Sequence, residues 1–239
     1  MVSWCMSVSD NIAEVRGRMV AAARRAGRSP DQIGLMAVTK TLPPEPIREA
    51  YAAGLRLLGE NRVQEFAGKA ASLADLANAE WHMIGHLQKN KAAKAAELFR
   101  AIDSLDSLKL AEKLDAAARG SGRRLRVVIE VNVGGEDAKS GVAPDSRELE
   151  ELVMAAPRLE GLEFRGLMTV PPFTEDPERA RPYFRKLREV RDAFAKRKLA
   201  RTGWDILSMG MSHDFEVAIE EGSTCVRVGT AIFGQRPKT

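Results

Sequence analysis

Three short segments of the sequence carry residue types that together could bind an aldehyde cofactor bearing a phosphate group. Lys40 closes the apolar run 33–39, and the segments Gly-Met-Ser at 210–212 and Arg-Val-Gly-Thr-Ala-Ile-Phe-Gly at 227–234 stand near the other end of the chain. A lysine amine can form a Schiff base with an aldehyde, and turns of small residues can hold a phosphate through their backbone amides. These are the groups that a pyridoxal phosphate site requires.

The secondary structure that carries these segments must bring them to one place. Eight apolar runs recur along the chain, most of them continuous rather than alternating, which is typical of parallel strands covered on both faces. The predicted strands are 33–40, 55–61, 81–88, 99–104, 125–133, 162–170, 205–212 and 224–233. Apolar residues at helical spacing fill every interval between them, and a further stripe at Ile12, Val15, Met19 and Ala22 predicts an extra N-terminal helix.

This alternation predicts a single α/β domain over residues 1–239, folded as a (β/α)8 TIM barrel, with residues 1–7 as a disordered tail. A doubly wound open sheet is the competing fold, because alternating strands and helices suit both. The count of eight strands favours closure, and no G-x-G-x-x-G motif follows the first strand.

In such a barrel, functional groups gather at the carboxyl ends of the strands, and the loops after strands seven and eight often hold a phosphate. The ends of the first, seventh and eighth predicted strands should therefore meet at one rim. The residues expected there are Lys40, Ser208, Met211, Ser212, Gly229 and Thr230. For Lys40 taken alone, the alternative is a lysine that merely extends its amine to solvent.

Arg227 should point into the barrel. Period two places Cys225, Arg227 and Gly229 on one face of the last strand and the flanking valines on the other. A buried guanidinium needs an acceptor, which could be the pyridine nitrogen of the cofactor or a structural ion-pair partner such as Glu130. If Arg227 donates to the ring nitrogen, the ring stays unprotonated and withdraws electrons poorly, which disfavours transamination.

Two other strand ends carry polar side chains. Asn61 follows the second predicted strand and could hydrogen-bond the cofactor or substrate, although an Asn in this place is also a common helix N-cap. His82 and His86 lie on one face of the third predicted strand. We expect one of them to be a core histidine and His86 to reach the rim.

Composition and charge narrow the functional classes. Cys5 and Cys225 are the chain's 2 cysteines and cannot form a disulfide framework, so a reducing cytoplasm fits. Neither a signal peptide nor an apolar run of membrane-spanning length is present, so no membrane association is expected. The net charge of +4 is diffuse, with 37 basic and 33 acidic residues.

The densest basic cluster, within 186–198, shares its segment with an apolar stripe at Tyr183, Leu187, Val190 and Phe194. We interpret this cluster as the solvent-facing side of an amphipathic helix, and expect no nucleic-acid partner. A nucleic-acid patch is the alternative, and it would show salt-dependent binding.

Beyond these local patterns, the chain resembles the pyridoxal phosphate homeostasis proteins, single-domain relatives of the N-terminal barrel of bacterial alanine racemase. The matching motifs span nearly the whole chain in order. They are Ala37-Val38-Thr39-Lys40, Gly59-Glu60-Asn61-Arg62-Val63-Gln64-Glu65, Trp81-His82-Met83-Ile84-Gly85-His86-Leu87-Gln88-Lys89-Asn90-Lys91, Lys139-Ser140-Gly141, Gly166-Leu167-Met168-Thr169, Gly210-Met211-Ser212-His213-Asp214 and the segment 227–234. Thr39 stands where many members of that family have Ser.

The resemblance implies that Lys40 forms the Schiff base, that Ser212, Gly229 and Thr230 hold the phosphate, and that Arg227 faces the pyridine nitrogen. It also implies a role in intracellular pyridoxal phosphate homeostasis without an established reaction. The partners expected are the cofactor itself and apo forms of enzymes that use it. We expect a cytoplasmic monomer without a metal site.

A weakly active amino-acid racemase that uses the same cofactor is the alternative function. Racemisation needs proton donors and acceptors on both faces of the imine, often a lysine and a tyrosine. Tyr51 and Tyr183 both fall on helical stripes away from the expected rim, and the barrel leaves no second domain to supply a base. His86 and His213 keep the alternative open, because either could approach from a rim loop.

Overall fold

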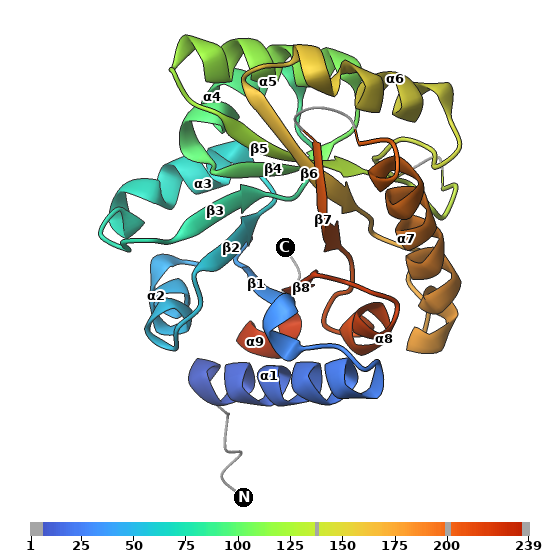
Figure 1. The fold of residues 1–239 in the computed structure, drawn as a ribbon. Helices are drawn as coiled ribbons and strands as arrows, with labels where there is room; N and C mark the ends of the chain where they lie inside the picture. The colour runs from blue at the N-terminus through green and yellow to red at the C-terminus, as the bar shows by residue number, and fades with distance from the viewer. Residues whose placement is uncertain (1–6, 137–138, 199–201, 236–239) are drawn as a thin grey trace, which may run out of the picture.

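The computed structural model describes residues 7–136, 139–198 and 202–235, and its strands form one closed parallel barrel in the order β1 to β8 (Figure 1). The strands are β1 Gly34–Val38, β2 Leu57–Glu60, β3 Glu80–Met83, β4 Ala101–Leu105, β5 Leu125–Glu130, β6 Leu162–Met168, β7 Thr202–Ser208 and β8 Cys225–Val228. Pairing of β1 with β8 closes the ring, with Gly34 opposite Cys225 and Met36 opposite Arg227. The predicted TIM barrel is confirmed, and the open sheet is excluded.

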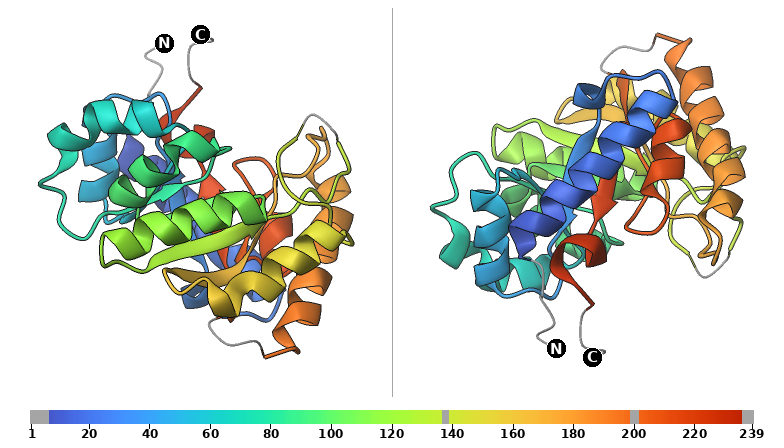
Figure 2. Two further views of the ribbon diagram at one scale, coloured as in Figure 1. Left: turned by 90° about the horizontal axis from the view of Figure 1, so that it is seen from above. Right: turned by 90° about the horizontal axis from the view of Figure 1, so that it is seen from below.

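Helices cover the outside of the barrel between successive strands (Figures 1 and 2). They are α1 Val8–Arg25, α2 Pro44–Ala52, α3 Val63–Ala70, α4 Ala92–Leu98, α5 Leu108–Gly120, α6 Arg147–Ala155, α7 Arg181–Ala195, α8 Phe215–Glu220 and α9 Thr230–Phe233. None of the helices within the described ranges is long and apolar enough to cross a membrane. The same ranges bring no three metal-ligating side chains together as a candidate metal site.

The predicted N-terminal helix is α1. Ser7 caps it, since its side chain accepts from the backbone N–H of Asp10 while the Asp10 carboxylate accepts from the N–H of Ser7. The helix packs beside α2, α8 and α9 along the seam between β1 and β8 (Figure 1). Residues 1–6 of the predicted tail lie outside the described residues, whereas Ser7 belongs to the helix cap.

Four predicted strands extend three or more residues beyond the observed carboxyl ends. β3 ends at Met83, β5 at Glu130, β7 at Ser208 and β8 at Val228. Loops follow the first three of these strands, and the short helix α9 follows β8. Gly210 has a φ of 95°, a left-handed conformation that leaves the strand. These loops are the part of the barrel that could surround a ligand.

Side chains alternate between the barrel interior and the helix layer. On β8, Val226 and Val228 pack with α1 and α8 in the outer core, while Cys225 and Arg227 face inward, as predicted. On α7 the buried stripe begins at Phe184 instead of Tyr183, which is half-buried. Residue 184, like 187, 190 and 194, faces the strands because these positions recur at helical spacing.

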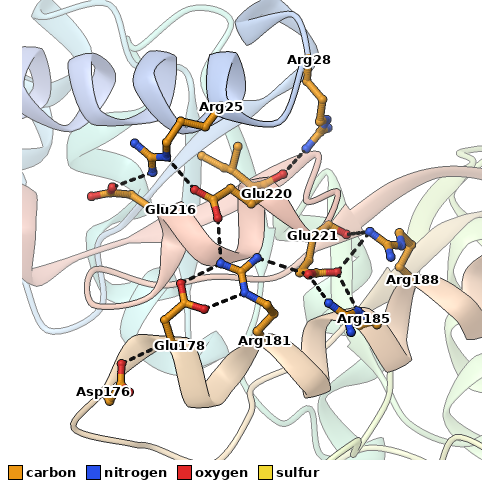
Figure 3. Close-up of polar contacts among 11 residues, drawn as sticks. Arg25, Arg28, Asp176, Glu178, Arg181, Arg185, Arg188, Glu216, Glu220 and Glu221 are labelled. Atoms are coloured by element: carbon orange, nitrogen blue, oxygen red, sulfur yellow. Dashed lines mark hydrogen bonds and ion pairs between the residues drawn. The ribbon is translucent and has the colours of Figure 1, made fainter.

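Arginines of α7 pair with Glu220 and Glu221 at the carboxyl end of α8 (Figure 3). The buried carboxylate of Glu221 lies 3.3 Å from Arg181, 3.0 Å from Arg185 and 3.2 Å from Arg188. Arg181 also binds Glu220, at 2.8 Å. Of the basic cluster at 186–198, Arg188 belongs to this network, whereas Lys186 pairs with Asp145 at 3.0 Å and Arg197 with Glu150 at 2.5 Å. These cations are therefore paired with carboxylates of the protein, as expected for the polar face of an amphipathic helix.

Candidate cofactor site at the carboxyl end of the barrel

Lys40 lies half-buried two residues after the end of β1, at the rim where the carboxyl ends of the strands open. The backbone on both sides of it is fixed. Thr39 donates its N–H to Gly59 O at 2.9 Å, and Lys69 Nζ donates to Thr39 O at 3.0 Å and to Leu42 O at 3.2 Å. Lys40 is therefore presented by a chain segment tied to β2 and α3.

An ion pair within the fold supports this segment. The amine of Lys69 lies 2.8 Å from the fully buried carboxylate of Glu60, which also accepts from the Thr39 hydroxyl. Burial raises the pKa of Glu60, and the hydrogen bonds from Lys69 and Thr39 oppose that rise. Loss of either partner would leave an uncompensated polar group beneath the segment that carries Lys40.

Arg227 is buried at the carboxyl end of β8, and its guanidinium reaches across two neighbouring strands. One Nη donates to Ser208 Oγ at 2.7 Å and the other to the carbonyl of Thr169 at 2.8 Å. Burial lowers the pKa of Arg227, and surrounding charges that include Glu130 oppose this. The ion pair considered for Arg227 and Glu130 is replaced by these two hydrogen bonds, and Glu130 acts on Arg227 through its charge alone.

Ser212 links the loop after β7 to the turn after β8. Its hydroxyl oxygen accepts from the N–H groups of Gly229 and Ala231, each at 3.2 Å. Gly229 is the N-cap of α9 and exposed Thr230 its first residue. The Ser212 O–H remains able to donate, so this turn presents hydroxyl and amide donors of the kind that bind phosphate.

The loop before Ser212 has little conformational freedom. A Cβ at Gly210 would lie 2.5 Å from the Cβ of Ala218, so glycine is needed where the loop passes over α8. The N–H of Met211 donates to Asp214 Oδ1 at 2.6 Å, and the carbonyl of Gly210 accepts from Arg227 N at 2.9 Å. Met211 is half-buried at the rim, and Ser208 lies deeper, fully buried under Arg227.

Asn61 follows β2 at the rim, next to the strand that leads to Lys40. The N-cap interpretation is wrong, because the N-cap of α3 is Arg62 and no side chain caps that helix end. A Cβ at Gly85 would lie 2.5 Å from the carbonyl oxygen of Asn61, so the β3 loop packs directly on this residue. Its side chain thus stands at the rim without a capping role.

The two histidines of the β3 segment separate as expected. His82 is inside the barrel and contacts Asp103, whereas His86 is exposed at the rim with its Nδ1 3.0 Å from Asp106. His213 is also at the rim, where its Nε2 lies 3.0 Å from the carbonyl of Glu175.

The structure brings further residues to the rim, of which the sequence indicates a role only for Glu130, as an ion-pair partner of Arg227. Burial raises the pKa of Glu130 to about 7 although Arg227 opposes the shift, and among the described residues its Oε2 has no hydrogen-bond partner. Thr169 supplies the carbonyl for Arg227, and Lys69 supports Lys40 from below. Thr169 belongs to a motif noted in the sequence, whereas Lys69 gave no signal beyond its spacing of four from Glu65.

The pairing of β1 with β8 and the contact of Ser212 with Gly229 place Lys40, Arg227 and Ser212 on neighbouring strand ends. Comparison with known proteins identifies the family. The family described as alanine racemase, N-terminal domain, matches residues 11–237. A pyridoxal phosphate homeostasis protein of Aquifex aeolicus is 47% identical over 232 residues, covering 97% of this chain and 99% of the relative. The chain belongs to the pyridoxal phosphate homeostasis protein family.

A further relative and two solved structures are also similar to this chain. The Pseudomonas aeruginosa protein of the same name is 45% identical over 96% of both chains. The structure of PipY from Synechococcus elongatus with pyridoxal phosphate bound superposes with a TM-score of 0.82, at 35% identity, over 95% of this chain and 100% of PipY. Alanine racemase of Streptomyces coelicolor shares the fold, with a TM-score of 0.67 at 23% identity over 94% of this chain and 59% of that enzyme.

Proposed function

We propose that this protein binds pyridoxal 5'-phosphate through a Schiff base to Lys40 and acts in intracellular pyridoxal phosphate homeostasis. The observation that carries the proposal is the meeting of an amine, a buried guanidinium and a hydroxyl-and-amide turn on neighbouring strand ends. The cofactor in the PipY structure, and the names of the relatives, support the same ligand. When bound, this cofactor supplies an aldehyde that captures a primary amine and a ring that can accept electron density.

The residues present fit that group. Lys40 would supply the amine, Ser212, Gly229 and Thr230 would hold the phosphate, and Asn61 and Met211 would flank the ring. Arg227, held from behind by Ser208, would donate to the pyridine nitrogen. A guanidinium stays protonated, so it keeps that nitrogen in its acceptor form and limits the ring as an electron sink.

A test of the covalent link is reduction followed by peptide mass spectrometry. Purified protein incubated with pyridoxal phosphate should show a visible absorption band that borohydride bleaches, and the reduced adduct should map to Lys40. Lys89→Ala, which alters an exposed lysine, is the matched control and should leave the band and the adduct unchanged. An adduct confined to another lysine would refute the assignment.

We infer that the bound cofactor is held rather than used in a racemase reaction. Tyr51 donates its hydroxyl to the carbonyl of Ala77, and its ring lies 3.8 Å from the guanidinium of Arg56, at the end of the barrel opposite Lys40. Tyr183 lies on α7. Tyr51 is therefore not placed to act as the second proton-transfer group, and Tyr183 belongs to the helix layer outside the barrel.

The His86–Asp106 pair at the rim is the observation that favours the racemase alternative, because a histidine oriented by a carboxylate is a common general base. Racemase and transaminase assays over a panel of amino acids separate the two functions. We expect no turnover above the rate of free cofactor. Robust turnover that disappears in Lys40→Ala and in His86→Ala would establish the enzymatic function instead.

The proposed setting is the cytoplasm, with the protein acting as a monomer that exchanges its cofactor with apo-enzymes. A transfer experiment addresses the exchange. The loaded protein is mixed with an apo-enzyme that requires pyridoxal phosphate, and the rate of activation is compared with the rate of cofactor release into buffer. Activation faster than release indicates direct transfer, and equal rates indicate release alone.

A further inference from the structure

The opposite end of the barrel contains a cavity that the cofactor site does not use. It lies where the strands begin, has a volume of about 300 Å³, and its wall includes Gly34, Glu80, Ala101, Arg126 and Cys225. We name it the lower cavity. A single buried water needs only about 10–15 Å³ of such volume, so the lower cavity has room for a small organic ligand.

Small side chains at the starts of the strands leave this space open. Gly34 of β1 stands opposite Cys225 of β8, and Ala101 of β4 stands opposite Arg126 of β5. A Cβ at Gly34 would have its nearest neighbours 3.7 Å away, which is ordinary contact. A larger residue could therefore occupy position 34 and fill part of the lower cavity without a clash at its Cβ.

Charged side chains dominate the polar part of the wall. The cationic groups are Arg56, His82, Arg126 and Arg165, and the carboxylates are Glu80 and Asp103. Burial lowers the pKa of His82, but the charge and hydrogen bond of Asp103, together with Glu80, outweigh burial and raise it to about 9. The imidazole is therefore protonated at neutral pH.

Two further carboxylates, outside the cavity wall, offset part of the positive charge at this end of the barrel. They belong to Glu163 and Asp205, which both pair with Arg165. Four cationic and two anionic side chains thus line the cavity, and the carboxylates of Glu163 and Asp205 are not part of that lining. An anion would be attracted into the lower cavity by this arrangement.

Two buried donors in the wall lack an acceptor. Within the described residues, neither His82 Nε2 nor Arg126 Nε has a hydrogen-bond partner. Each side chain is anchored through its other nitrogens, His82 Nδ1 to Asp103 at 3.0 Å and Arg126 Nη2 to Glu80. The carboxylate of Glu80 lies 3.9 Å from His82 Nε2, too far for a hydrogen bond. Burying a donor without an acceptor is unfavourable, so an acceptor from outside the chain is favoured.

We propose that the lower cavity is a second ligand site, which takes a small organic carboxylate whose oxygens accept from His82 Nε2 and Arg126 Nε. Carboxylate suits these donors because charged N–H groups bind its two oxygens in preference to a neutral acceptor. The site shares no residue with the proposed cofactor site, so it does not rest on the proposed function.

The experiment is a titration of the protein with sodium acetate and sodium succinate at constant ionic strength, followed by the imidazole nitrogen resonances of its 3 histidines. The Nε2 resonance of His82 should change in a saturable way with at least one of the two anions. Acetamide, similar in size and uncharged, should produce no such change. A His82 resonance that responds to neither anion would overturn the proposal and leave water as the acceptor.

Three variants locate the response, each checked for its fold by circular dichroism. Arg126→Lys keeps the charge beside Glu80 but lacks the Nε donor, and should weaken binding at least about tenfold. Gly34→Val fills space with every charge retained, and should abolish binding. Arg124→Lys alters an exposed neighbour and should bind as the original chain does. Unchanged binding in both Arg126→Lys and Gly34→Val would place the anion elsewhere and refute the site.

Discussion

The two ends of this barrel are built in different ways. At the carboxyl end, Arg227 is engaged with Ser208 and Thr169, and Ser212 is engaged with Gly229. A rim group that lacks a partner in the described part of the chain, Glu130 Oε2, is an acceptor. At the amino end, charged side chains project from the strands themselves, and His82 and Arg126 each keep one buried donor without a partner among the described residues. At the carboxyl end, hydrogen bonds hold the loops in place before a ligand binds. At the amino end, two buried donors need an acceptor from outside the chain.

The same residue pair occurs at both ends in contrasting environments. His82 and Asp103 lie 3.0 Å apart with side chains 12% and 3% exposed, while His86 and Asp106 lie 3.0 Å apart with side chains 57% and 16% exposed. Burial decides how much such a pair contributes to stability. Solvent screens the exposed pair, whereas the groups of the buried pair have little water to replace a lost partner. The buried pair is thus a structural element of the barrel interior.

The largest expected effect is at the carboxyl end. Lys40→Ala removes the amine that the proposal requires, and should abolish the borohydride-stable adduct completely. Its acetate titration should be unchanged, because the lower cavity contains no part of Lys40. Mass spectrometry and the His82 resonance measure the two outcomes in one preparation. Loss of both responses would mean that the two ends are not independent.

The next effect concerns stability. Asp103→Asn leaves a protonated histidine buried without its carboxylate, and should lower the free energy of unfolding by about 3 kcal/mol. Asp106→Asn makes the same change at the exposed pair, and should cost less than about 1 kcal/mol. Urea denaturation measures both. Equal losses would show that burial does not distinguish the two pairs.

One titratable group at each end of the barrel should make the stability depend on pH, each over its own pH range. The pKa of His82 is raised from 6.5 to about 9, so its contribution is fully present below about pH 6.5 and is lost as the pH rises through 9. The pKa of Glu130 is raised from 4.5 to about 7, so stability falls as the pH rises between these values.

The free energy of unfolding of two variants, measured as a function of pH, assigns these two pH ranges to residues. His82→Gln should remove the alkaline part of the fall in stability, and Glu130→Gln should remove the part between about pH 4.5 and 7. Both profiles are measured on the cofactor-free protein. A Glu130→Gln profile that retains the lower window would assign that window to other carboxylates.

The smallest effect is expected at the phosphate turn. Ser212→Ala removes one hydroxyl that orders the turn, while the backbone amides and Thr230 remain. The affinity for pyridoxal phosphate should fall about tenfold, equivalent to about 1.4 kcal/mol. Equilibrium dialysis measures it, with Ser121→Ala, a change at the end of α5, as the control. Unchanged affinity would remove Ser212 from the proposed site.

These two ends also differ in how far the sequence predicts them. Strand count, the inward face of Arg227 and the meeting of the seventh and eighth strand ends follow from periodicity and contiguous motifs. The ends of β3, β7 and β8 do not, because a continuous apolar run hides the point where hydrogen bonding to the next strand stops. The acceptors of Arg227 depend on a cross-strand geometry that no local pattern encodes.

No pattern in the sequence predicts the lower cavity. Its wall takes one or two residues from each of several strands, such as Gly34, Ala101 and Arg126, none of which belongs to a local motif. Their proximity arises from the register with which the barrel closes. His82 gave only the expectation of a core histidine, and its Asp103 partner gave no signal at all.

The most direct test of the central claim is a crystal structure of the protein grown with pyridoxal phosphate. We predict electron density continuous from Lys40 Nζ to the cofactor, with the ring nitrogen toward Arg227 and the phosphate against Ser212, Gly229 and Thr230. Density for the cofactor elsewhere, for instance with its phosphate beside Arg126 in the lower cavity and none at Lys40, would contradict the account.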